Sequence, residues 1–222
     1  MKPPAVAVMA KVPGAAVVKS RLHTVLTPEQ ATALYRCFLL DRLDGLAIVS
    51  GIERVVAFTP AESGDEMAAL VPAGFRCMPQ QGRDLGERLA GLLAGLIAEG
   101  HTAAIAIDSD SPTLPMAHVA EAARVLSEKM ADVVIGPADD GGYYLIGVTA
   151  PQPRLFKDVP WSTSSVLPTT LARAKELGLR SHLLPPWFDV DTDSDLMRLR
   201  QQLKMDGDGP PRTRSFLSAL YG

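Results

Sequence analysis

The stretch AVAVMAKVPGAAVVKSRL, residues 5–22, decides the fold class. It begins with an uninterrupted apolar run, which is typical of a strand that is covered on both faces of a sheet. A loop of small residues follows and ends in Lys19, Ser20 and Arg21. Because ligands of α/β sheets gather beyond the carboxyl ends of the strands, this basic loop raises the question of a phosphate-binding site.

The loop fits only part of the P-loop pattern, in which a glycine stands directly before the lysine and the Ser/Thr. Val18 occupies that position, and a β-branched residue resists the backbone angles that turn successive N–H groups toward a phosphate. Pro13 removes one further N–H group from the segment. These departures argue against a P-loop NTPase, and on these residues alone a surface turn with a basic tip is the better interpretation.

Other apolar runs resemble the first. Together with residues 5–9, they predict strands over residues 54–58, 103–107, 132–135 and 143–148. Apolar residues at helical spacing lie between them, and the predicted helices begin near Thr27, Leu85, Pro115, Leu167 and Thr192. Strands that alternate with helices predict a three-layer α/β/α sandwich with a mostly parallel central sheet.

Composition excludes several classes of protein. The 222 residues are 47% hydrophobic and 21% charged, and a net charge of -3 gives no basic footprint for nucleic acid. No run reaches the ~18 apolar residues of a membrane span, and the first run is too short for a signal peptide. We therefore expect a cytoplasmic protein with no nucleic-acid partner and no membrane span. Cys37 and Cys77 lie far apart in the sequence and predict buried free thiols.

We expect a single domain over residues 1–222. Residues 204–222 would form a C-terminal linker and tail, because the segment KMDGDGPPRTR is polar and rich in Gly and Pro. The short apolar end that follows could dock on its own domain or on a second copy, so a homodimer is possible.

Carboxylates follow one of the predicted strands at close spacing. Asp108 and Asp110 stand directly after the run 103–107, and strand alternation would place both side chains on one side. Two such carboxylates suit Mg²⁺ or Mn²⁺, hard ions that prefer oxygen ligands and hold phosphates. Aspartates are also common in turns and helix caps, which is the alternative. Asp189 and Asp191 precede the last predicted helix and could be the second half of the metal site; the alternative is that the segment only caps the helix, through Thr192 or Asp193.

The segment DDGG joins two predicted strands. Asp139, Asp140, Gly141 and Gly142 could form a hairpin turn, because Asp-Gly is a strong turn signal. The same residues would let backbone N–H groups and carboxylates approach a polar ligand closely. Tyr143 begins the next strand and could stack on that ligand or form a hydrogen bond with it.

The segment PWSTSSV, residues 160–166, is ambiguous in the same way. Trp161 and Ser162 could belong to a helix cap with a packed aromatic ring. They could equally form one wall of an acceptor site, because aromatic faces suit sugar rings and other flat ligands.

Six segments together carry a family resemblance. They are KVPGAAVVKSRL (11–22), GRDLGERL (82–89), IDSDSPTL (107–114), GPADDGGYYLIG (136–147), PWSTSSVL (160–167) and DVDTDSDL (189–196). In this order and spacing they resemble the nucleotide-diphospho-sugar transferase superfamily, with the glycosyltransferase A fold, over nearly all of residues 4–203. More closely, the chain is similar to a bacterial family of predicted glycosyltransferases, some members of which are associated with arsenosugar biosynthesis.

The resemblance implies a role for the opening loop. In such families the loop after the first strand wraps the nucleotide, so Lys19 and Arg21 would meet its phosphates and Gly14 would permit close approach. Lys11 would belong to the same nucleotide-binding loop. In the segment GRDLGERL, Asp84 and Gly86 would lie near the base and the ribose.

The resemblance also implies roles for the acidic residues. Asp110 matches the metal-holding acid after the fourth strand, and Asp191 matches the late metal ligand, with Asp189 nearby. Asp108 stands where a small or apolar residue is more usual in the family. Asp139 and Asp140 would face the sugar or acceptor, as would the acceptor-side set Gly141, Gly142, Tyr143, Trp161 and Ser162.

We therefore expect a metal-dependent glycosyltransferase that uses Mg²⁺ or Mn²⁺ with a nucleotide sugar and a small-molecule acceptor. A carboxylate such as Asp140 would take the proton of the acceptor hydroxyl. The first alternative is a nucleotidyltransferase, in which a phosphorylated acceptor attacks an NTP and pyrophosphate leaves. The second alternative is a nucleotide-binding module without catalytic activity.

Overall fold

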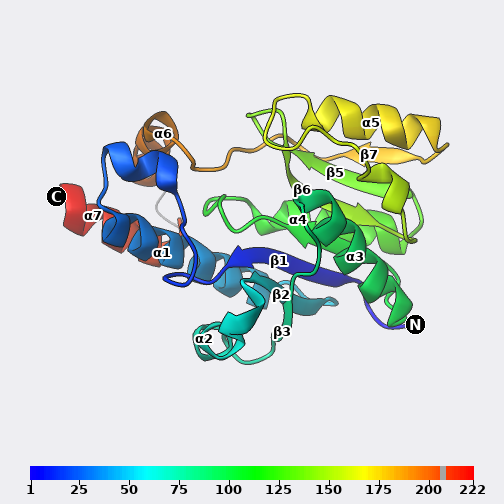
Figure 1. The fold of residues 1–222 in the computed structure, drawn as a ribbon, viewed down its shortest axis with the longest axis horizontal. Helices are drawn as coiled ribbons and strands as arrows, with labels where there is room; N and C mark the ends of the chain where they lie inside the picture. Colours follow the sequence, from blue (N-terminus) through cyan, green and yellow to red (C-terminus); the bar gives the residue numbers. More distant parts are fainter. Residues whose placement is uncertain (206–208) are drawn as a thin grey trace.

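The chain is organised around a seven-stranded sheet with the strand order β3-β2-β1-β4-β6-β5-β7 (Figure 1). The computed structural model describes residues 1–205 and 209–222. Its strands are β1 (Ala5–Lys11), β2 (Glu53–Thr59), β3 (Arg76–Pro79), β4 (Ala104–Ile107), β5 (Val133–Pro137), β6 (Tyr143–Val148) and β7 (Ser181–Leu183). All five predicted strands are present, and β3 and β7 are additional.

The sheet is mostly parallel, as predicted. β1 pairs in parallel with both β2 and β4, β2 with β3, and β5 with β7. The exception is β6, which runs antiparallel to both β4 and β5. The two strands that the sequence did not reveal are the edges of the sheet. Both are short and only partly buried, so they lack the continuous apolar run that marks a central strand.

Helices cover both faces of the sheet (Figure 1). They are α1 (Pro28–Ala47), α2 (Gly64–Leu70), α3 (Leu85–Ala98), α4 (Met116–Ser127), α5 (Val166–Glu176), α6 (Asp193–Met205) and α7 (Pro211–Tyr221), with single 3₁₀ turns η1 (Ser20–Thr24), η2 (Ala61–Ser63) and η3 (Pro153–Leu155). Thr27 caps α1 through a reciprocal capping box with Gln30.

The alternation of side chains along β1 divides the core into two layers. Val6 and Val8 pack with apolar residues of α1, α2 and α4 on one face. Ala5 and Ala7 pack with apolar residues of α3 and α5 on the other face. The predicted three-layer α/β/α sandwich is therefore confirmed. Among the helices of the described residues, none is both long and apolar enough to cross a membrane.

The C-terminal segment differs from the expected linker and loose tail. α7 begins at Pro211, inside the segment expected to be a linker, and packs against α1 and α6 through buried Leu217. The carboxylate of Asp41 on α1 accepts hydrogen bonds from the first N–H groups of α7, at Arg212 (3.1 Å) and Thr213 (2.8 Å). The helix is thus capped by a side chain far away in sequence, which a local pattern cannot reveal. The rest of the expected linker includes residues 206–208, which lie outside the described residues.

Both cysteines are free, but they are half-buried rather than fully buried.

Candidate active site

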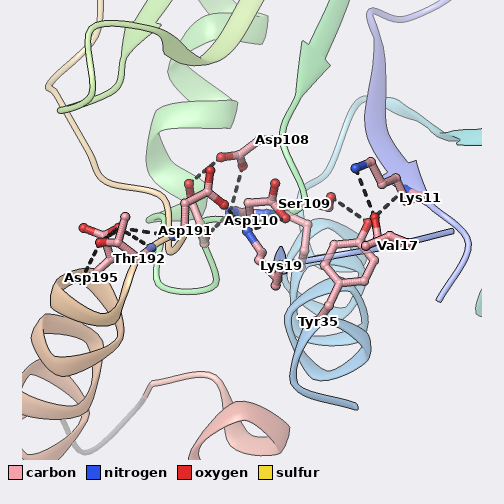
Figure 2. Close-up of polar contacts among 12 residues, drawn as sticks. Lys11, Val17, Lys19, Tyr35, Asp108, Ser109, Asp110, Asp191, Thr192 and Asp195 are labelled. Carbon is pink, nitrogen blue, oxygen red and sulfur yellow. Dashed lines mark hydrogen bonds and ion pairs between the residues drawn. The ribbon is translucent and has the colours of Figure 1, made fainter. Parts of the chain in front are cut away.

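The carboxyl ends of the central strands bring together three charged side chains that are distant in sequence. Lys19 follows β1, Asp110 follows the neighbouring strand β4, and Asp191 precedes α6. The Lys19 Nζ lies 3.0 Å from Asp110 Oδ1 and 2.7 Å from Asp191 Oδ1 (Figure 2). A backbone hydrogen bond of 3.0 Å from Val190 N–H to the Asp110 carbonyl holds the two acidic segments together. One ammonium group thus joins the two residues that the resemblance predicts as metal ligands.

Lys19 is held in place by its backbone and by burial. It adopts the left-handed conformation, with φ 49° and ψ 37°, and only 3% of its side chain is exposed. Burial alone would lower the pKa of Lys19, but the charges of Asp110 and Asp191 outweigh it and the pKa is raised. The lysine is therefore a fixed cation at this end of the sheet.

A buried hydroxyl group connects the opening loop to the rest of the site. The Lys11 N–H donates a 2.9 Å hydrogen bond to the Tyr35 hydroxyl, which lies 3.0 Å from the Ser109 hydroxyl (Figure 2). Tyr35 belongs to α1, and Ser109 lies between the two aspartates that follow β4. The loop after β1 and the loop after β4 are thus fixed to each other through α1.

Asp108 is engaged differently from Asp110. Its carboxylate lies 3.5 Å from the guanidinium group of Arg42, a fully buried residue of α1, and it accepts a short hydrogen bond from Ser111. Arg42 also donates to the Ser111 carbonyl. Burial, opposed by Arg42 and reinforced by Asp110, raises the pKa of Asp108 to about 6. The carboxylate therefore serves first as the counter-ion of a buried arginine.

Carboxylates outnumber cations in this region. Burial raises the pKa of Asp189 to about 7, and the charges of Asp191, Asp140 and Asp108 reinforce the effect. The part of the rise that comes from these charges reflects repulsion between carboxylates, which a bound cation would relieve. The structure thus brings together an acidic cluster that consists of Asp110, Asp189, Asp191, Asp140 and the more deeply buried Asp108.

Two adjoining cavities open onto this cluster. One, of about 480 Å³, is lined by the opening loop and by residues after β2, β3 and β4, including Lys11, Lys19, Arg21, Gln80, Arg88 and Asp110. The other, of about 740 Å³, is lined by Asp140, Gly142, Tyr143, Trp161, Ser162 and Asp189, among others. Arg21, Asp108, Asp110, Ser162 and Asp191 line both. The site thus has two compartments that meet at the acidic cluster, which suits two substrates.

The second compartment is built on the β5–β6 hairpin. The Gly141 N–H donates a 3.1 Å hydrogen bond to the Ala138 carbonyl, and the Gly142 N–H donates a 2.8 Å hydrogen bond to the Asp140 carboxylate. Gly141 has φ 91°, and a Cβ atom there would lie 2.5 Å from the Ser164 carbonyl oxygen. The hairpin-turn interpretation of DDGG is therefore confirmed. Asp140 and Gly142 also line a cavity, and their contact with a ligand stays a prediction.

The aromatic residues of this compartment contact each other. Tyr143 and Trp161 pack edge to face, with ring centroids 6.3 Å apart. Ser162 has φ 63° and lines both cavities. The aromatic-wall interpretation of Trp161 is consistent with this placement, and the helix α5 begins only at Val166.

Several predicted residues lie outside the two compartments. The carboxylate of Asp139 turns toward α6 and pairs with Arg198 at 2.6 Å. Asp84 caps α3 by accepting a 2.8 Å hydrogen bond from the Glu87 N–H, and Gly86 packs under Trp161; both line a neighbouring cavity of about 490 Å³. Gly14 has φ 93°, so its turn needs a glycine, but it lines neither compartment.

Sequence reasoning missed other lining residues. Gln80 follows β3, the edge strand that was not predicted, and its amide group donates to the carbonyls of Ala10 (3.2 Å) and Ala57 (2.8 Å). Arg88 and Leu85 lie in the quoted segment GRDLGERL and face the cavity in place of Asp84 and Gly86. A helical projection of this segment could have separated the two faces.

The donor set fits a divalent cation. Asp110 and Asp191 already direct one oxygen each to a single cation, the Lys19 ammonium group. One or two carboxylates together with substrate phosphates are the usual ligands of Mg²⁺. Asp189 stands close enough to feel the charge of Asp191 and could add a third oxygen.

Comparison with known proteins gives a family. A family model described as "Uncharacterized protein conserved in bacteria (DUF2064)" matches residues 43–163. The crystal structure of a candidate nucleotide-diphospho-sugar transferase from Desulfovibrio desulfuricans G20 is 31% identical, with a TM-score of 0.90 over 99% of this chain and 95% of that chain. No curated protein matches the sequence.

Two more distant structures share the fold alone. CMP:2-keto-3-deoxy-manno-octonic acid synthetase, solved with CTP, is 12% identical with a TM-score of 0.56, over 92% of this chain and 99% of that chain. 4-Diphosphocytidyl-2C-methyl-D-erythritol synthase from Anaerococcus prevotii DSM 20548 is 10% identical with a TM-score of 0.57, over 91% and 96%. The fold expected from the sequence is thus shared with both sugar-transferase and cytidylyltransferase structures.

Proposed function

The chain belongs to the DUF2064 family, and we propose that it is a metal-dependent glycosyltransferase that moves a sugar from a nucleotide-diphospho-sugar to a small-molecule acceptor. The observation that carries the proposal is the contact of Lys19 with both Asp110 and Asp191 at the junction of two cavities. The relative from D. desulfuricans, which is described as a nucleotide-diphospho-sugar transferase, supports the same class of donor. The association with arsenosugar biosynthesis stays a prediction from the sequence.

The first compartment would bind the nucleotide diphosphate. Lys19 and Arg21 stabilise the negative charge that develops on the leaving diphosphate, because fixed cations in a partly enclosed site act more strongly than in water. The Lys19 ammonium group has three N–H donors, of which the two aspartates take two, so the third can go to a phosphate oxygen. Mg²⁺ or Mn²⁺, held by Asp110 and Asp191 with Asp189, would supply further positive charge at the same oxygens.

The second compartment would bind the sugar and the acceptor. Asp140 lines it and takes the proton from the acceptor hydroxyl as that oxygen attacks the anomeric carbon. Tyr143 and Trp161 provide apolar ring surface for the sugar, and Ser162 and Gly142 provide polar groups beside it. The bond from the anomeric carbon to the diphosphate breaks, and the nucleoside diphosphate leaves.

The test is to identify the leaving group. The purified protein would be incubated with nucleotide sugars and candidate acceptors in the presence of Mg²⁺ or Mn²⁺, and the release of nucleoside diphosphate would be measured. We expect release in the wild type and a loss of about 10²–10³-fold in Asp110→Asn. Asp193→Asn is the matched control, because Asp193 is exposed, stands two residues from Asp191 and lines neither compartment. Donor turnover that is equal in all three proteins would contradict the proposed site.

A nucleotidyltransferase is the second candidate, favoured by one observation. Arg88 adds a fourth basic side chain to the first compartment, beside Lys11, Lys19 and Arg21, and this charge would suit a triphosphate. That activity requires an NTP and a phosphorylated acceptor and releases pyrophosphate. Pyrophosphate release from an NTP without any hydrolysis of nucleotide sugars would establish it. Binding of nucleotide without release of either product would establish the third alternative, a non-catalytic module.

A further inference from the structure

A second polar cluster lies at the end of the sheet opposite the candidate active site. His101 stands before β4, whereas Asp108 follows that strand at its other end. Glu53 is the first residue of β2, and Glu99 caps the C-terminal end of α3 beside the N-terminal segment (Figure 1). One ligand atom from each of His101, Glu53 and Glu99 lies within 4.8 Å of the others, and no other such group occurs among the described residues.

The orientation of His101 is fixed by its backbone partner. Its Nδ1 lies 2.7 Å from the Pro3 carbonyl oxygen, and since a carbonyl can only accept, Nδ1 carries the hydrogen. In the neutral ring Nε2 then keeps its lone pair. The His101 side chain is fully buried, and Nε2 has no hydrogen-bond partner among the described residues. A free ring nitrogen is therefore buried and has a fixed direction.

The free nitrogen faces two carboxylates. Its distance is 3.4 Å to Glu53 Oε2 and 3.7 Å to Glu99 Oε2. A lone pair opposite two negative charges is repulsive, so this arrangement needs a cation between the three groups. That cation is either a proton on Nε2 or a metal ion bound to all three.

Arg76 compensates the two carboxylates from one side, and the charge of Lys2 also acts on Glu99. The Arg76 guanidinium lies 3.2 Å from Glu53 Oε1, and it donates hydrogen bonds to Glu99 Oε1 (3.0 Å) and Oε2 (2.8 Å). It thereby fixes both carboxylates from one side. Carboxylates that are themselves hydrogen-bonded, and a histidine whose other nitrogen donates to a backbone carbonyl, are the usual outer partners of a metal site.

We propose that His101, Glu53 and Glu99 bind a divalent transition-metal ion, for which Zn²⁺ is the best match. One imidazole nitrogen with two carboxylate oxygens is a set that Zn²⁺ accepts, whereas Mg²⁺ and Ca²⁺ prefer oxygen ligands alone. Glu53 and Glu99 are each about one-third exposed, at 31% and 34% of the side chain, so water can complete the coordination. The ion would join the N-terminal segment, β2, α3 and β4, and its role is structural.

The test uses the small number of histidines. The chain has only four, so ¹⁵N-labelled histidine side chains can be followed individually by NMR. Metal-free protein would be titrated with Zn²⁺ in the Asp110→Asn/Asp191→Asn background, which removes the candidate active-site ligands. We expect one equivalent of Zn²⁺ to shift the His101 Nε2 resonance while Nδ1 keeps its hydrogen.

Two variants locate the ion. His101→Gln and Glu99→Gln should each weaken Zn²⁺ binding at least about tenfold in a calorimetric titration. Glu99→Gln lies at an exposed helix end, so it keeps the test valid if His101→Gln fails to fold. His182→Gln is the matched control, because His182 lies 3.1 Å from a single carboxylate, that of Glu121, and is not part of such a group of three.

Either of two results would overturn the proposal. A His101 Nε2 that carries a hydrogen at neutral pH and does not respond to Zn²⁺ would show that a proton alone compensates the cluster. Zn²⁺ affinity that is unchanged in His101→Gln and Glu99→Gln would place the ion elsewhere. Neither result depends on the proposed transferase activity, since the measurement is of binding.

Discussion

Lys19 and Asp191 are separated by 172 residues in sequence, yet the lysine donates a 2.7 Å hydrogen bond to the aspartate. The contact joins the loop after β1 to the segment before α6, and apolar packing of Leu22 with Phe188 and Val190 supports it. Asp191 is held for this contact by the start of α6, where its N–H donates to the Asp195 carboxylate at 3.2 Å.

Removing this lysine should affect activity and stability together. In Lys19→Met we expect turnover to fall about 10²–10³-fold, because a fixed cation at the leaving group is lost. We expect the free energy of unfolding to fall by about 2 kcal/mol, less than the ~3–5 kcal/mol of a fully enclosed pair, because both aspartates are over a third exposed. Urea denaturation measures the second effect. Lys11→Met is the control for stability, with a change within about 0.5 kcal/mol, because the Lys11 side chain is exposed and its ammonium group donates to the Val17 carbonyl.

The two aspartates after β4 should separate into different roles. Asp110→Asn should raise the Mg²⁺ concentration for half-maximal turnover by more than about tenfold, since a ligand is lost. Asp108→Asn should instead lower the free energy of unfolding by about 3–5 kcal/mol, because buried Arg42 loses its counter-ion. Its Mg²⁺ dependence should change little. The opposite assignment of the two effects would restore Asp108 as the principal metal ligand.

The hairpin glycine should be sensitive to a single methyl group. In Gly141→Ala we expect a loss of stability of more than about 1 kcal/mol, since φ is 91° and the new Cβ would lie 2.5 Å from the Ser164 carbonyl. Turnover should also fall, because the displaced turn carries Asp140. Gly178→Ala is the matched control: its φ is 69°, but a Cβ there meets nothing within 4 Å. Thermal unfolding of both variants separates the steric contact from the backbone conformation, and equal losses would contradict the contact.

His118 should make stability depend on pH. Burial lowers its pKa, so the folded protein binds fewer protons at this group than the unfolded chain does, whose histidine pKa is ~6.5. The stability from this group is therefore present above pH ~6.5 and lost as the pH falls through the lowered pKa. Nearby Glu121 opposes the shift without reversing it. The free energy of unfolding of the wild type and of His118→Gln would be measured in urea from pH 8 to pH 5. As the pH falls, we expect the wild type to lose more of it than the variant.

The sequence predicted the central layer of the fold because burial leaves a pattern there. β1 and β4 are apolar at every buried position, and Thr27 and Gln30 form the predicted cap. β7 and α7 were missed or misjudged for the opposite reason. The edge strand is mostly exposed, and α7 depends on Asp41, which lies far away in sequence.

The candidate site was predicted in its residue types more than in its contacts. Asp110 and Asp191 lie close together, as expected. Asp110 follows β4 at the carboxyl ends of the central strands, and Asp191 lies at the same end of the sheet, directly before α6. The pairing of Asp108 with Arg42 could not be predicted, since a helical arginine gives no sign of being buried. Likewise, Asp139 and Asp140 are neighbours in sequence, and only the geometry of the turn sends one toward Arg198 and the other into a cavity.

The capping of α7 by Asp41 has a consequence for the order of events during synthesis. Thr213 is made 172 residues after Asp41, a delay of roughly 10–30 s at ordinary rates of translation. Until then Asp41 on α1 lacks the N–H partners that it has in the finished protein, where its side chain is buried. Asp41 directly precedes Arg42, which pairs with Asp108 at the candidate site. The strands β1 to β6 have been made by Val148, but we expect α1 to reach its final packing only when α7 leaves the ribosome.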